Sequence, residues 1–222
     1  MFRVPCPPQH TKENKSINSQ EKIIIMNTRK IFPLVLICLW SLANCKKEST
    51  TTTTTTTTGS KFTLTSIAVA NGLLLNAYKC ETKVNGAENS IPLAWSNAPA
   101  TANAFAITMI HYPNPNDLTN ISSYLELWGI DKSVTSIAYG KADEGPWFMG
   151  PNKDLNTISY TSPCSAGAGT HQYTITIYAL SATHASLPKQ NSMNVTYSTL
   201  VNALSTVTII DKATLVFNAV TP

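Results

Sequence analysis

Residues 171–180, with the sequence HQYTITIYAL, alternate between two sets of side chains and are rich in β-branched and aromatic residues. Successive side chains of an extended strand point to opposite faces of a sheet, so His171 and Tyr173 would lie on the same face as Ile175. The segment therefore predicts a β-strand with an apolar face. A domain that buries this face must be built around a sheet.

Four other segments have the composition of strands, because apolar and β-branched residues lie between clusters of Asn, Gly, Ser and Pro that mark turns. They are residues 62–68, 103–110, 123–130 and 215–220. No regular helical pattern separates these segments. This arrangement predicts a mainly β, antiparallel domain with a few peripheral helices.

One segment near the C-terminus has the spacing of a buried helical stripe, with apolar side chains at i, i+3, i+4 and i+7. The stripe consists of Tyr197, Leu200, Val201, Leu204 and Val207. Either Asn194 or Thr196 would cap the start of this helix. We therefore expect a helix to pack its apolar side against the β domain.

Residues 145–150, GPWFMG, place three large apolar side chains in a segment without strand or helix periodicity. Two interpretations are open. The loop folds back onto the core, or it forms a lid or contact patch over a binding pocket.

The N-terminal part of the chain has the layout of a secretory signal peptide over residues 26–44. A basic pair precedes an apolar run at 31–40, which is too short to span a bilayer, and small residues follow. Residues 42–45, LANC, resemble the cleavage box of a bacterial lipoprotein, in which Cys45 is acylated. The alternative is an ordinary signal peptide whose cysteine is incidental. The favoured interpretation predicts an exported protein, anchored through Cys45 to a bacterial cell envelope, in the periplasm or at the outer membrane.

The segment after this cysteine predicts a tether. Residues 45–60 contain nine consecutive threonines at 50–58 and nothing apolar to bury, so we expect a disordered linker before a domain at 61–222. Residues 1–25 have the character of neither a signal nor a domain. The simplest explanation is that translation begins at Met26 and that this leader is untranslated or unstructured.

The charge of the chain is divided unevenly between these parts. The whole chain has a formal net charge of +4. Residues 1–60 hold a net +5, whereas residues 61–222 hold eight Lys, no Arg and nine Asp or Glu, a net −1. Without a basic cluster the domain lacks the electrostatic attraction that drives nucleic-acid binding. We therefore expect no nucleic-acid partner.

Cys80 and Cys164 are the two cysteines of the predicted domain. After export they would meet an oxidising compartment, where disulfides persist. A bridge between them would close a loop of roughly 85 residues, worth about 4–5 kcal/mol by the chain-entropy model. The alternative is a pair of buried free thiols.

Four short sequence motifs follow one another along the predicted domain. They are YKC (78–80) with SIPLAW (90–95), Pro99 with AFAI (104–107), YTSPC (160–164), and HQY (171–173) running into YAL (178–180). Together they resemble the phosphatidylethanolamine-binding protein family, especially its bacterial Raf-kinase-inhibitor-like branch, over roughly residues 61–222. The resemblance implies a large antiparallel sheet packed against a smaller one. It also implies a small surface cavity for phosphate-like anions.

In that family the cavity is built from an Asp-Pro-Asp-x-Pro loop, a His that starts a later strand, and the His and Tyr of a His-Arg-Tyr motif. Here HYPNP (111–115) replaces the acidic loop, Tyr124 replaces the strand His, and Gln172 replaces the Arg. Of the family's binding set only His171 and Tyr173 carry over, and the predicted ligand residues are these two together with His111, Tyr124 and Tyr160. With both carboxylates lost, we expect weaker anion binding. The alternative is that His171 and Tyr173 are purely structural.

The sequence contains no set of residues typical of hydrolysis, group transfer or metal binding. It therefore predicts a non-catalytic binding module without a cofactor or metal, for a small anion or a phospholipid head group. The alternative is a protein-interaction or inhibitor domain that keeps the fold but has lost the anion pocket.

Overall fold

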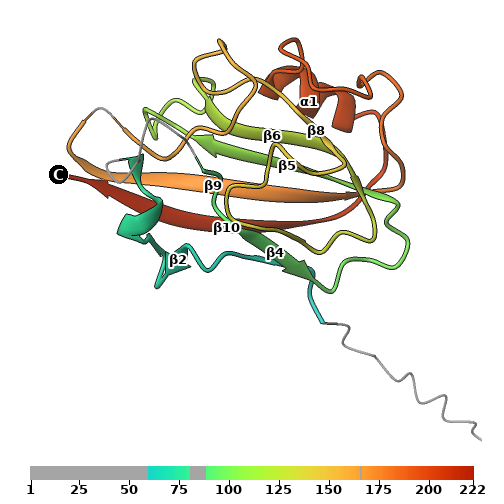
Figure 1. The fold of residues 1–222 in the computed structure, drawn as a ribbon, viewed down its shortest axis with the longest axis horizontal. Coiled ribbons are helices and arrows are strands. Elements are labelled where there is room, and N and C mark those ends of the chain that lie inside the picture. Colours follow the sequence, from blue (N-terminus) through green and yellow to red (C-terminus); the bar gives the residue numbers. More distant parts are fainter. Residues whose placement is uncertain (1–59, 81–88, 166) are drawn as a thin grey trace, which may run out of the picture. The chain divides into compact units, whose positions relative to one another are not determined.

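The computed structural model describes residues 60–80, 89–165 and 167–222 (Figure 1). The predicted leader, signal peptide and most of the tether, including Cys45, lie outside these residues. Within the described residues, no helix combines the length and the hydropathy needed to cross a bilayer.

The larger of two sheets has seven strands. Their spatial order is β2 (Val69–Ala70), β3 (Leu73–Leu74), β10 (Ile209–Thr221), β9 (Gly169–Leu180), β5 (Ala104–His111), β6 (Ser122–Asp131) and β8 (Phe148–Met149). Neighbouring strands are antiparallel except β3 and β10, which pair in parallel. The sheet therefore brings segments that are far apart in the sequence into one surface, which Figure 1 shows as a stack of long ribbons.

The smaller sheet has three antiparallel strands, with β4 (Leu93–Ser96) between β1 (Thr63–Thr65) and β7 (Ser136–Ile137). Side chains such as Leu64 and Trp95 face the large sheet and join the main core between the two layers. The ring of Trp95 meets that of Phe105 edge-on, with centroids 5.7 Å apart. The expected class, a large sheet packed against a smaller one, is confirmed.

The predicted alternation of the strand at 171–180 is present in β9. Tyr173, Ile175 and Ile177 are fully buried in the main core, whereas Thr174 and Thr176 on the other face are half-buried. The strand begins earlier than predicted, at a glycine with a φ of 126°. The alternation of apolar and polar side chains along β9 therefore reflects the burial of only one face of the strand.

A second, smaller core lies on the other face of the large sheet. The helix α1 (Tyr197–Leu204) packs Leu200 and Leu204 against Ala106 of β5 and Trp128 of β6. Because the sheet is covered on both faces here, all eight residues of β5 are buried, which explains its continuous apolar run.

The predicted helix is confirmed, and Thr196 is its cap, since its side-chain oxygen accepts a hydrogen bond from the backbone N–H of Thr199. Tyr197 and Val201 are only half-buried, although both belong to the predicted stripe. A short 3₁₀ helix, η1 (Asn76–Tyr78), is the other helical element of the described chain.

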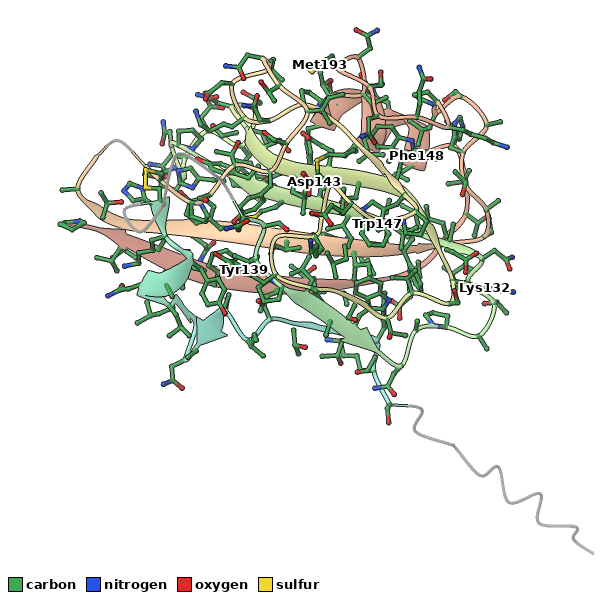
Figure 2. The ribbon with its side chains drawn as sticks, viewed as in Figure 1. Lys132, Tyr139, Asp143, Trp147, Phe148 and Met193 are labelled. Atoms are coloured by element: carbon green, nitrogen blue, oxygen red, sulfur yellow. A yellow bond between two sulfur atoms is a disulfide. The ribbon has the colours of Figure 1, made fainter. Side chains whose placement is uncertain are left out.

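The GPWFMG segment folds back onto the protein. Met149 is buried in the main core, and the indole N–H of Trp147 donates to the carbonyl of Ala142 at 2.6 Å. Phe148 lies near α1 in Figure 2 and packs against the second core. Phe148 and Met149 form β8, which pairs with β6, and all these contacts favour the interpretation of a loop that returns to the core.

A disulfide joins Cys80 to Cys164, with Cα atoms 5.4 Å apart and a sequence separation of 84 (Figure 2, yellow bond). The predicted disulfide is therefore present, and the alternative of two buried free thiols is wrong. It ties the segment after η1 to the loop that leads into β9.

Candidate functional site

The candidate site lies where β5 ends and β9 begins. The two strands are antiparallel neighbours, so the last residue of β5, His111, pairs with Tyr173 near the start of β9. This register brings the rings of His111 and His171 together, with centroids 5.6 Å apart and planes at 81°. The C-terminal end of β10 lies at the same end of the sheet (Figure 1).

Each imidazole is held through one ring nitrogen. Nδ1 of His111 lies 2.9 Å from the carbonyl oxygen of Gln172, and Nε2 of His171 lies 2.8 Å from that of Gly167. A carbonyl can only accept, so these two nitrogens must carry the hydrogens. The second nitrogen of each ring has no hydrogen-bond partner in the described part of the chain. It accepts a hydrogen bond when the ring is neutral and donates one when the ring is protonated.

The two rings line a cavity of about 360 Å³, which we call the imidazole pocket. Its other polar side chains are Ser122, Tyr124, Lys153 and Ser165. No Asp or Glu is among the described residues of this wall. A neighbouring cavity of about 300 Å³ shares His111, Pro113 and His171 with it. The described wall therefore has three side chains that can carry positive charge and none that carries negative charge.

Lys153 is the charged wall residue that the sequence does not predict as part of the site. It lies in the loop after β8, where its backbone N–H donates to Thr161 Oγ1 at 3.1 Å and its ammonium group pairs with Asp154 at 2.5 Å. Nothing in the sequence around Lys153 distinguishes it from any surface lysine. Only the return of this loop past β6 brings it to the pocket.

Tyr173 supports the pocket from behind. Its side chain is fully buried and does not belong to either cavity wall. The phenol ring stacks on His111 with centroids 4.9 Å apart, and its hydroxyl lies 3.1 Å from Ser165 Oγ. On its other side it stacks on Phe217, at 5.6 Å. Tyr173 therefore positions His111 and the Ser165 loop and does not face the pocket, whereas the sequence predicts it as a ligand residue.

The other two predicted tyrosines have different places. Tyr124 lines the imidazole pocket, although only 2% of it is exposed, and its ring meets that of Tyr173 edge-on. Tyr160 is buried in the main core and lines neither of the two cavities. The structure thus brings His111, Tyr124 and His171 together around one pocket, and leaves Tyr160 outside it.

The described chain offers no metal centre. Across residues 60–80, 89–165 and 167–222, His, Cys, Asp and Glu side chains do not form a group of three that could hold a metal ion.

Comparison with known proteins agrees with this architecture. The family model of the phosphatidylethanolamine-binding proteins matches residues 65–219. The chain belongs to the phosphatidylethanolamine-binding protein family. This finding confirms the resemblance in the motifs at 78–80, 90–95, 160–164 and 171–173. A comparison with curated proteins finds no significant match.

Two solved structures of family members have the same fold. The phosphatidylethanolamine-binding protein homologue CT736 of Chlamydia trachomatis aligns with a TM-score of 0.59 at 22% identity, covering 72% of this chain and 98% of its own. YbcL of E. coli, described as a member of the mammalian family, aligns with a TM-score of 0.58 at 20% identity, covering 73% of this chain and 100% of its own. At these identities the likeness concerns the fold alone.

Proposed function

We propose that this member of the phosphatidylethanolamine-binding protein family binds a small phosphate-bearing ligand in the imidazole pocket. The observation that carries the proposal is the convergence of His111 and His171, each with one nitrogen already bound to a backbone carbonyl and the other without a described partner. The ligand that suits such a pair can both donate and accept.

A phosphate monoester has this dual character, because its second pKa is about 6 and it carries several acceptor oxygens. As a monoanion it donates its P–OH to a neutral imidazole, and as a dianion it accepts from a protonated one. The wall adds the ammonium of Lys153 and the hydroxyls of Ser122 and Ser165. A phospholipid head group or a free phosphate compound would present the same chemistry.

The charge of the wall supports an anion over a cation. Lys153 is the one permanently basic side chain of the described wall, which includes no Asp or Glu, although its ammonium group also pairs with Asp154 outside that wall. The pair of carboxylates that characterises the family site is replaced by the HYPNP segment, so we expect modest affinity for the anion. A volume of about 360 Å³ lies at the lower end of ligand pockets, which fits a head group rather than a whole lipid.

The same geometry supports a binding role without catalysis. Both imidazoles are oriented by carbonyls and not by carboxylates, so neither has the acidic partner that stabilises an imidazolium in general acid–base catalysis. The hydroxyl of Ser165 is next to Tyr173 and not next to a histidine nitrogen. Turnover of a phosphoester that is abolished by His171→Ala would contradict this part of the proposal.

We also propose that the protein is exported and anchored by a lipid on Cys45, with residues 45–60 as the tether. The support is the LANC segment that follows an apolar run. Labelling with a radioactive fatty acid should mark the wild type and fail for Cys45→Ala. A wild type that takes up no label would contradict the anchor and leave the binding proposal intact.

Isothermal titration of the full chain with inorganic phosphate and with phosphoethanolamine tests the pocket. We expect binding by the wild type and a dissociation constant at least about tenfold higher in His111→Ala and in His171→Ala, since each loses a charge-assisted hydrogen bond. The matched control is His184→Ala, because His184 lies in a distant loop and bonds Ser186.

No binding by the wild type, or equal binding by the two pocket variants and the control, would overturn the proposal. A protein partner whose binding survives His171→Ala would then favour the alternative of an interaction domain. Phosphate binding without phosphoethanolamine binding would restrict the ligand to free phosphate compounds.

A further inference from the structure

A larger cavity lies on the other face of the sheet, between α1, the first half of β6 and the loop that follows β8. Its volume is about 600 Å³, and we call it the α1 cavity. Apolar side chains such as Ile121, Leu155 and Val201 form part of its wall, together with the hydroxyl groups of Ser123 and Thr196. It shares Lys153 with the imidazole pocket and otherwise has a different wall.

The unusual residue of this cavity is Glu126. It lies on β6 opposite Thr108 of β5, flanked in sequence by Leu125 and Leu127, which face the main core. Glu126 therefore points to the α1 side of the sheet, the side on which Trp128 packs. Only 1% of it is exposed, so this carboxyl is among the most deeply buried polar groups of the described chain.

The chain after β8 is shaped to cover Glu126. The backbone N–H of Gly150 donates to the carbonyl of Glu126 at 3.0 Å. A Cβ at position 150 would lie 3.2 Å from Cβ of Glu126 and 2.5 Å from the carbonyl oxygen of Val195. Such a Cβ would also lie 3.3 Å from Oε2 of Glu126, so glycine at 150 lets this backbone fit between Glu126 and the segment before α1.

One oxygen of this carboxyl is left unsatisfied. Oε2 of Glu126 is buried and has no hydrogen-bond partner within the described residues. Burial raises the pKa of Glu126 to about 7, and a hydrogen bond from Ser123 opposes part of that rise. A buried polar atom without a partner normally costs about 1–3 kcal/mol or more, so Oε2 of Glu126 is a candidate acceptor for a donor that enters the cavity.

The charged and titratable groups around the cavity do not supply that partner. On the loop after β8, the ammonium of Lys153 pairs with Asp154. On α1, Tyr197 has a raised pKa because its hydroxyl is desolvated, with smaller effects from Tyr178 and Tyr112.

The other described elements add no charge to the wall. The segment before β6 contributes Thr119, whose hydroxyl bonds the carboxylate of Asp117. On β5, the residue that pairs with Glu126 is the uncharged Thr108, which is not part of the wall. Glu126 is thus the only carboxyl of the described wall, and no cation of the described chain binds it.

We propose that the α1 cavity is a second ligand site, for a small organic amine whose ammonium group donates to Oε2 of Glu126 and whose apolar body packs against Ile121, Leu155 and Val201. A cationic donor suits this site better than a neutral one, because a charge-assisted hydrogen bond in a desolvated place is about twice as strong. The volume of about 600 Å³ accommodates a ligand of this kind. This site goes beyond the proposed anion function and does not depend on it.

Titration calorimetry of the full chain with benzylamine and with benzyl alcohol tests the site. We expect benzylamine to bind the wild type at pH 7, benzyl alcohol to bind at least about tenfold more weakly, and Glu126→Gln to remove this preference for the amine. Binding also ionises Glu126. Titrations in two buffers with different ionisation enthalpies should therefore reveal the release of a fraction of a proton per benzylamine.

The controls separate the site from its neighbours. Glu144→Gln changes an exposed carboxyl that pairs with Lys141, and should bind benzylamine as the wild type does. His171→Ala should also keep benzylamine binding, so failure of the imidazole pocket and failure of this site are distinguishable. Val201→Phe places a bulky ring in the cavity from the half-buried face of α1 and should block binding.

Absence of benzylamine binding to the wild type would overturn the proposal. So would equal affinity for the amine and the alcohol, equal binding by Glu126→Gln, or binding without proton release. If Glu126→Gln does not fold, Val201→Phe decides the question, and unchanged binding by that variant would overturn the site.

Discussion

His111 and Glu126 lie on neighbouring strands, but their surroundings give them different chemistry. His111 faces the main-core side, where Tyr173 stacks on its ring and the carbonyl of Gln172 accepts from Nδ1. Glu126 faces the α1 side, where its Oε2 has no partner in the described chain. The imidazole is thus oriented for a ligand, whereas the carboxyl is desolvated and one of its oxygens is unsatisfied within the described residues. The first arrangement favours anions and the second favours cationic donors.

The raised pKa of Glu126 predicts a pH dependence of stability. Its carboxyl titrates near 7 in the folded protein and near 4.5 when unfolded, so the folded state holds more protons between these values. Stability from this group is complete below pH 4.5 and is lost as the pH rises through 7. Relative to Glu126→Gln, the wild type should lose about 2–3 kcal/mol of unfolding free energy between pH 5 and pH 8.

Urea denaturation of both proteins at the two pH values measures this difference. Glu144→Gln is the control, since its exposed carboxyl should leave the pH dependence as in the wild type. Parallel pH profiles for the wild type and Glu126→Gln would contradict the assignment of a buried, desolvated carboxyl.

At the scale of elements, β5 and β6 are covered on both faces for most of their length. The main core packs on one side, and α1 with the segment before it packs on the other. The helix is only eight residues long, which is too short to be stable alone, so it depends on its packing and its cap. The α1 cavity therefore depends on an element whose stability is mostly tertiary.

Removal of the cap should weaken this element. Thr196→Ala deletes the oxygen that accepts from the backbone N–H of Thr199, and we expect a loss of about 1 kcal/mol of unfolding free energy. Thr196→Ser keeps a hydroxyl at the same place and should remain within a few tenths of a kcal/mol of the wild type. The midpoints of urea denaturation distinguish the two. Equal midpoints for both variants would argue that packing alone holds α1.

At the scale of the whole described domain, the disulfide links two segments that no strand pairing joins. Cys80 follows η1, and Cys164 lies in the loop before β9 and in the wall of the imidazole pocket. The bridge therefore restrains the unfolded chain over a long loop and also fixes one side of the pocket in the folded state.

Loss of the bridge should affect both properties. We expect Cys80→Ser/Cys164→Ser to lose about 4 kcal/mol of unfolding free energy and to bind inorganic phosphate more weakly than the oxidised wild type. Reduction of the wild type should reproduce the effect, and reductant should not change the double variant. Identical denaturation of the oxidised and reduced wild type would contradict this prediction.

Local periodicity was enough to predict the long strands and the helix. The alternation at 171–180 and the stripe at 197–204 reflect the covalent geometry of a strand and a helix, which any chain of this pattern inherits. Short strands such as β4 and β7 have too few residues to show a pattern. The strand β10 begins at Ile209 and not at the predicted residue 215, because its first half is mostly exposed and therefore shows no alternation of apolar and polar side chains. The bounds of these strands are set by hydrogen bonding to neighbouring strands.

The sequence by itself determined the family, the alternation of β9, the capped helix and the presence of His111, Tyr124 and His171 in the segments that line the pocket. Only the tertiary structure decided that the two imidazoles meet, that Tyr173 is buried behind them, that Lys153 enters the wall and that Glu126 is desolvated beside a cavity. The physical reason is the distance along the sequence between the residues that interact. Periodicity depends on neighbours along the chain, whereas burial, pKa and the meeting of side chains depend on strand register and layer packing between residues far apart in sequence.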